Sequence, residues 1–90
     1  MHQDIEVGDH LLAIDVEQKS DPADAAIIIG FTVRVIVTRH DGMPVRGSTR
    51  AEDSGELTGD HGPYATAGDA MAHGEAWGRH FVARILGGHV

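Results

Sequence analysis

The chain has 90 residues, the size of one domain with a small hydrophobic core. It contains no cysteine, which excludes disulfides and thiolate metal sites, and its net charge of −7 opposes binding of the whole surface to nucleic acids or anionic membranes. The first ten residues lack the basic and apolar regions of a signal peptide, and no apolar run reaches about 18 residues, so we expect a cytoplasmic protein without a membrane span.

No linker, repeat or low-complexity tract divides the sequence, and residues 1–90 are predicted to form a single domain. Residues 1–9 are mostly polar and are predicted to be a loose lead-in or a short strand. Residues 87–90 are predicted to be a tail.

The first clear strand signal lies in residues 10–19. Leu12, Ile14 and Val16 alternate with more polar residues, and this period of two is typical of a half-buried strand. The turn-forming stretch SDPADAA, residues 20–26, then interrupts the strand.

A second strand is predicted over residues 27–40, where β-branched residues dominate. One of its faces carries a continuous apolar row, made of Phe31, Val33, Val35 and Val37. The dipeptide Asp41-Gly42 follows and indicates a hairpin that leads to a third strand.

Burial selects the register of this hairpin. A two-residue loop would place Arg46 and Arg50 on the buried face, which is costly for charged side chains. A three-residue loop over residues 41–43 shifts the pairing by one position and exchanges the two faces. In this register the residues on the core side are Val45, Gly47, Thr49 and Ala51. The residues that point outward are Arg46, Ser48 and Arg50.

Residues 52–63 lack periodicity and are predicted to be an exposed loop. A long helix is predicted to follow, with Thr66 as its N-cap, Asp69 in its first turn, and Gly87-Gly88 as its stop. The residues that recur on one face of this helix are Ala70, Gly74, Trp77, Gly78, Phe81 and Ile85. The glycines are expected to let the helix lie close to the sheet, with Trp77 buried against the apolar row of the second strand.

Three strands followed by a helix that begins GPYATAGDA resemble a group of small uncharacterised bacterial βββα proteins. The arrangement is also distantly similar to HicB-type antitoxins, which have a partial double-stranded-RNA-binding-like fold. The resemblance covers residues 10–87 and implies an α+β fold: a three-stranded antiparallel sheet with one long C-terminal helix packed on one face. It carries over no catalytic residue.

Seven histidines raise the possibility of a metal site. His73 and His80 are seven positions apart, which separates them by about 10 Å along a helix and is too far for one ion. The carboxylates of residues 52–60 lack the regular alternation of a calcium loop. We therefore predict no metal, no cofactor and no enzymatic activity.

A cluster of arginines is the candidate partner-binding surface, because four of the seven basic residues lie between positions 34 and 50: Arg34, Arg39, Arg46 and Arg50. One interpretation is that Asp15 and Glu17 simply neutralise Arg34 across the strands. The other is that the face binds an acidic partner. The leading hypothesis is a small non-enzymatic protein-protein interaction module that uses an open sheet face or edge strand, for another protein or a second copy. The alternative is a nucleic-acid-binding or antitoxin-like regulator that uses the basic hairpin face, although the net charge makes nucleic acid an unfavourable partner.

Overall fold

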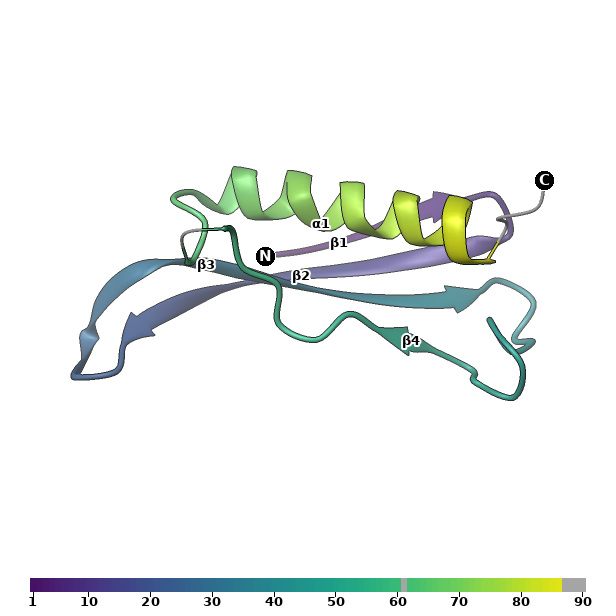
Figure 1. Cartoon of the computed structure of the whole chain (residues 1–90), viewed down its shortest axis with the longest axis horizontal. Helices are drawn as coiled ribbons and strands as arrows, with labels where there is room; N and C mark the ends of the chain where they lie inside the picture. The colour runs from purple at the N-terminus through teal and green to yellow at the C-terminus, as the bar shows by residue number, and fades with distance from the viewer. Residues whose placement is uncertain (61, 87–90) are drawn as a thin grey trace.

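The computed structural model describes residues 1–60 and 62–86 and shows an antiparallel sheet crossed by one C-terminal helix (Figure 1). The strands are β1 (His2–Val7), β2 (His10–Asp21), β3 (Asp24–Arg39) and β4 (Glu52–Asp53), in the order β1-β2-β3-β4. The helix α1 (Ala67–Phe81) continues into a π-helical turn, η1 (Val82–Leu86). None of the helices in this part of the chain is long and apolar enough to cross a membrane.

The α+β class is confirmed, but the sheet has four strands rather than three. The lead-in forms β1, which pairs with β2 from His2↔Asp15 to Val7↔His10. Its weak apolar pattern is sufficient because only Ile5 and Val7 pack against the core.

The core lies between the sheet and α1. The period-two prediction for β2 and β3 is confirmed, because alternate side chains of both strands are buried: Leu12, Ile14, Val16, Val33, Val35 and Val37. The two strands pair in register from His10↔Arg39 to Lys19↔Gly30, which makes them the centre of the sheet.

The start of the helix agrees with the sequence prediction. The backbone N–H of Asp69 donates to Oγ1 of Thr66 at 3.0 Å, which confirms Thr66 as the N-cap. Nε of Arg79 donates to Glu75 at 2.8 Å on the outer side of the helix. The predicted stop at Gly87-Gly88 lies outside the described residues.

The glycines bring α1 close to the sheet, as predicted. Gly74 and Gly78 are buried, and a Cβ atom at Gly74 would lie 2.6 Å from Cγ2 of Val33. Trp77 packs against the core, as predicted, but it is partly rather than fully buried and stacks on Phe81 with ring centroids 5.1 Å apart. Because the close approach leaves no room for an indole under the helix axis, Trp77 lies at its flank.

The predicted hairpin after β3 is wrong. Residues 45–49 form a turn of their own, in which the N–H of Val45 donates to the carbonyl of Thr49 at 2.8 Å. Pro44 has no N–H for strand pairing, and Gly47 has a φ of 53°, so the chain turns back instead of running along β3.

Strand β4 pairs with β3 further along the chain, through Ile36↔Asp53 and Val37↔Glu52, in the stretch predicted to be a loop. Val45 is buried as predicted, whereas the other residues expected on the core side are exposed: Gly47, Thr49 and Ala51.

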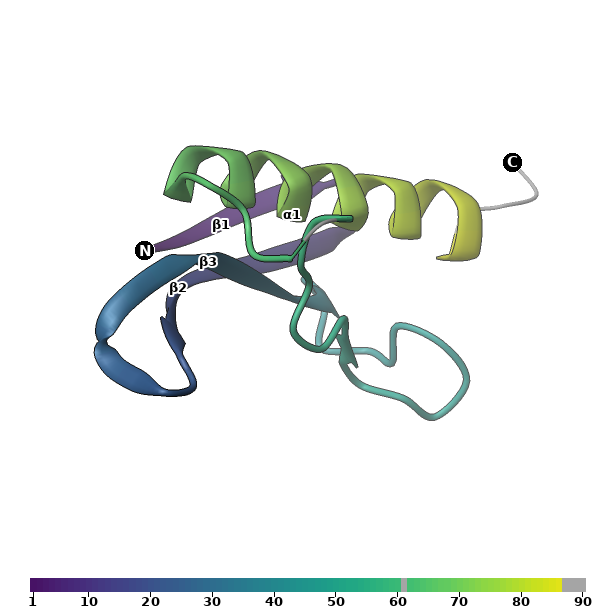
Figure 2. The same ribbon diagram turned by 60° about the vertical axis from the view of Figure 1, so that its left-hand side comes forward.

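The distal end of the β2–β3 hairpin extends past the start of α1 and curls away from it (Figures 1 and 2). At its base, the chain that leads to the helix crosses β3, and Phe31 and Tyr64 exchange two backbone hydrogen bonds of 2.8 Å. Gly30 makes this crossing possible, since a Cβ atom there would lie 2.7 Å from the carbonyl oxygen of Tyr64. We call the hairpin beyond Gly30, residues 20–29, the arm.

Candidate functional site

The arm exposes three consecutive isoleucines. The exposed fractions are 49% for Ile27, 45% for Ile28 and 46% for Ile29, which are high values for large aliphatic side chains on a strand. Neighbouring residues of a strand point to opposite faces, so both faces of the arm are apolar. If a partner covered the exposed half of one of these side chains, the burial would contribute about 1 kcal/mol to the free energy of binding.

The backbone of the arm is also incompletely paired. Ser20 pairs with Ile28 and Asp21 pairs with Asp24, so residues 25–27 and Ile29 have no partner on β2. On its other edge β3 pairs with β4 at residues 36–37 and forms bridges at Val33 and Phe31. Within residues 1–60 and 62–86, no strand pairs with that edge over residues 24–29. The arm therefore presents an open strand edge.

The two aspartates of the arm are used to build its turn. Oδ1 of Asp21 accepts the N–H of Ala23 at 2.8 Å, and Oδ1 of Asp24 accepts the N–H of Ala26 at 3.0 Å. Both carboxylates lie at the tip, so the stretch from Ala25 to Ile29 carries no charge.

Each of the four candidate arginines contacts an acceptor of the same chain. Nε of Arg34 donates to Asp53 at 2.9 Å, and Nη2 of Arg39 lies 2.9 Å from Asp41. Nη2 of Arg46 lies 2.7 Å from Glu52, and its guanidinium is 5.8 Å from the centre of the Phe81 ring. Nη1 of Arg50 donates to the carbonyl of Gly42 at 2.7 Å.

The sheet separates Arg34 from Arg46. Their partners, Asp53 and Glu52, are consecutive residues of β4 and so point to opposite faces of the sheet. Arg46 lies on the side of α1, next to Phe81, whereas Arg34 lies on the open side. The arrangement expected from the hairpin register, with both arginines projecting together, is therefore not formed.

These contacts shift the ionisation of the acids. The Arg39 guanidinium and then the N–H of Met43 lower the pKa of Asp41 to about 2. The N–H of Gly55 and, next, the guanidinium of Arg34 lower the pKa of Asp53. The charged forms of Asp41 and Asp53 are thus favoured.

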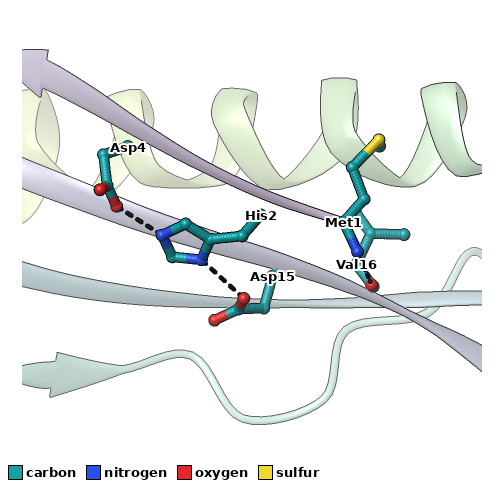
Figure 3. A network of polar contacts seen from close by, with 5 residues as sticks. All are labelled: Met1, His2, Asp4, Asp15 and Val16. Atoms are coloured by element: carbon teal, nitrogen blue, oxygen red, sulfur yellow. Dashed lines mark hydrogen bonds and ion pairs between the residues drawn. The ribbon is translucent and has the colours of Figure 1, made fainter.

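The open face of the sheet carries a histidine held between two carboxylates (Figure 3). Nδ1 of His2 is 2.6 Å from Asp15, and Nε2 is 2.7 Å from Asp4. The hydrogen bond to Asp15 and then that to Asp4 raise the pKa of His2, because both ring nitrogens donate only in the imidazolium form. Next to this network is a hollow of about 140 Å³, lined in part by Asp15, Glu17, Arg34 and Glu56.

An open groove of about 420 Å³ follows the flank of α1, and its lining includes Tyr64, His73, Trp77 and His80. The rings of Tyr64 and His73 lie 4.7 Å apart. In the part of the chain that the structure describes, no three histidine, cysteine or acidic side chains gather as they would around a metal ion. Trp77 thus borders this groove with its partly buried ring.

No family model, curated protein or solved structure matches this chain. The similarity to HicB-type antitoxins and to double-stranded-RNA-binding-like folds stays a prediction, and the site must be interpreted from its own chemistry.

The arm was not predicted from the sequence, although a signal for it was present. Residues 27–29 are apolar, but the residues that end β2 beside this stretch are the polar Lys19, Ser20 and Asp21, of which Ser20 pairs with Ile28. A core strand would have apolar neighbours at these positions, so the mismatch indicates that the isoleucines lie outside the core.

Proposed function

We propose that this chain is a small non-enzymatic protein-binding module whose contact surface is the arm. The observation that carries the proposal is the row Ile27–Ile29, about half exposed on an open strand edge of an otherwise acidic molecule. Contiguous apolar surface on a small domain is typical of an interaction site.

Strand addition is the mode of binding that the geometry favours. An extended partner segment would pair with the free edge of β3 over residues 24–29 and cover isoleucine side chains on both faces. Backbone hydrogen bonds would provide part of the affinity, and the apolar side chains would select a partner that is also apolar.

Docking of an acidic partner or a polyanion on the arginines is supported less well. Arg34, Arg39 and Arg46 already form ion pairs within the chain, and a partner would have to displace Asp53, Asp41 and Glu52 in turn. Arginines on opposite faces of the sheet also cannot act together on one flat surface. We therefore base the proposed function on the arm.

Site-specific photo-crosslinking tests the proposal. A photoreactive residue at Ile28 is expected to give a discrete protein adduct when the chain is expressed in its own host cells, whereas the same residue at Ala72, exposed on α1, gives none. Adducts from both positions, or from neither, would contradict the assignment of the arm as the contact surface.

A further inference from the structure

We propose that the occupant of the arm is a second copy of this chain, with the two β3 edges paired antiparallel through residues 25–29. This inference rests on the proposed function and names its partner. The pairing is self-complementary, as a two-fold interface requires, and it closes after two copies.

The sequence of the arm fits this pairing. With Ile27 on the two-fold axis, Ala26 of each copy faces Ile28 of the other, and Ala25 faces Ile29. Asp24 then faces Gly30, so no two like charges meet across the new ladder. Apolar side chains cover apolar side chains along the whole segment.

The charge of the molecule restricts where two copies can meet. The net charge is −7, and the open sheet face carries several carboxylates, so contact between most surfaces brings like charges together. The segment 25–29 is uncharged and lies at one end of a molecule with dimensions of 44 × 21 × 19 Å. Two copies joined there make contact only through this uncharged segment, so the interface itself brings no carboxylates together.

The small size of the arm predicts a weak dimer. Five residues per copy bury far less than the roughly 800 Å² per partner of a standard interface. We therefore expect reversible association at concentrations of order 0.1–1 mM. Association should strengthen as salt rises from about 0.05 to 0.5 M, because salt screens the repulsion between the acidic bodies.

Sedimentation equilibrium of the purified chain up to about 1 mM measures this association directly. The weight-average mass of the wild-type chain is expected to rise with concentration to about 1.5–1.8 times the monomer mass. Ile28→Lys is expected to remain a monomer because a charge at the edge opposes pairing. Met43→Lys is the matched control, since Met43 is exposed at 58% but lies outside the arm, and it should associate like the wild type. A wild-type monomer at the highest concentration, or an Ile28→Lys dimer, would overturn the inference.

A single-cysteine variant tests the register independently of Ile28→Lys. The chain has no native cysteine, and residues that face each other in an antiparallel ladder have Cα atoms close enough for a disulfide. Oxidised Ile27→Cys should form a covalent dimer, whereas Ala72→Cys should not. A dimer by sedimentation without this cross-link would contradict pairing about Ile27.

The photo-crosslinking result separates the two proposals. If the wild-type chain is monomeric and Ile28 cross-links to a different protein, the second copy is the wrong partner and the binding module stands. If the chain is monomeric and Ile28 cross-links to nothing, both proposals are wrong.

Discussion

At the residue scale, two histidines of the sheet are expected to respond to pH in opposite directions. The carboxylates of Asp15 and Asp4 raise the pKa of His2 above 6.5. Burial and then the nearby Arg39 lower the pKa of His10 below 6.5. The contribution of His2 to stability is therefore present below pH 6.5 and lost as pH rises through its raised pKa, whereas that of His10 is present above pH 6.5 and lost as pH falls through its lowered pKa.

Titration of the histidine ring protons by NMR checks this prediction. His2 should titrate above pH 6.5 and His10 below it. Asp15→Asn should lower the pKa of His2 and leave that of His10 unchanged. Equal pKa values for the two histidines in the wild-type chain would show that the network in Figure 3 does not form in solution.

Gly30 is the residue on which the position of the arm depends. Its φ of 153° and the close approach of Tyr64 both oppose a side chain, so Gly30→Ala should destabilise the chain by about 1–3 kcal/mol in urea denaturation. Gly8→Ala separates the two causes: Gly8 has a φ of 59°, but a Cβ added there would meet no atom within 4 Å, so we expect a loss of about 1 kcal/mol. Equal losses of unfolding free energy in the two variants would mean that the chain at Tyr64 does not pack closely against Gly30.

At the element scale, the separation between α1 and the sheet is set by the glycines. Gly74→Ala should destabilise by about 1–2 kcal/mol despite better helix propensity, because the new Cβ would lie 2.6 Å from Val33 and 3.0 Å from Ile14, two side chains with stiff χ1 rotamers. Gly68→Ala, in the exposed first turn, should stabilise by about 0.5–1 kcal/mol. Thermal or urea unfolding measures both changes, and a stabilised Gly74→Ala variant would be inconsistent with this packing.

The elements that the sequence predicted correctly are those with local signals. The alternation of Leu12, Ile14 and Val16, and the cap at Thr66, depend on residues within one strand or one turn, and both are found in the structure. Strand β4 has no local signal, because two acidic residues form it only by pairing with the distant Ile36 and Val37. The register of β4 depends on the number of residues in the turn between the two strands, which includes residues 45–49. The hydrophobic periodicity of the sequence does not reveal that number.

The candidate site was harder to predict than the fold for a related physical reason. Which side chains are buried on α1 depends on how closely the helix approaches, and small residues rather than Trp77 decide that distance. The exposure of Ile27–Ile29 follows from the length of the hairpin relative to the helix, since α1 covers only the proximal part of β3 (Figure 2). Hydrophobicity alone cannot distinguish a covered strand from one that extends past its cover.

At the scale of the whole molecule, charge predicts weak contact with nucleic acids. The net charge is −7, and three of the four candidate arginines (Arg34, Arg39 and Arg46) form ion pairs within the chain, so short duplex DNA or RNA at about 0.15 M salt should cause no saturable NMR shifts. Saturable, salt-sensitive shifts at Arg46 and Arg50 would favour the nucleic-acid alternative. In that case Arg46→Glu with Arg50→Glu should abolish the shifts.

The crossing of residues 62–64 over Gly30 affects which part of the sequence can change without disturbing the core. The backbone hydrogen bonds between Phe31 and Tyr64 mark the boundary between two parts of the β2–β3 hairpin. Core packing ends on one side of this boundary, and the exposed arm begins on the other. We therefore expect that another hairpin of similar length can replace residues 20–29 and will point in the same direction from the core. If the arm is the contact surface proposed above, exchange of these ten residues would change the binding preference while the core that determines folding stays the same.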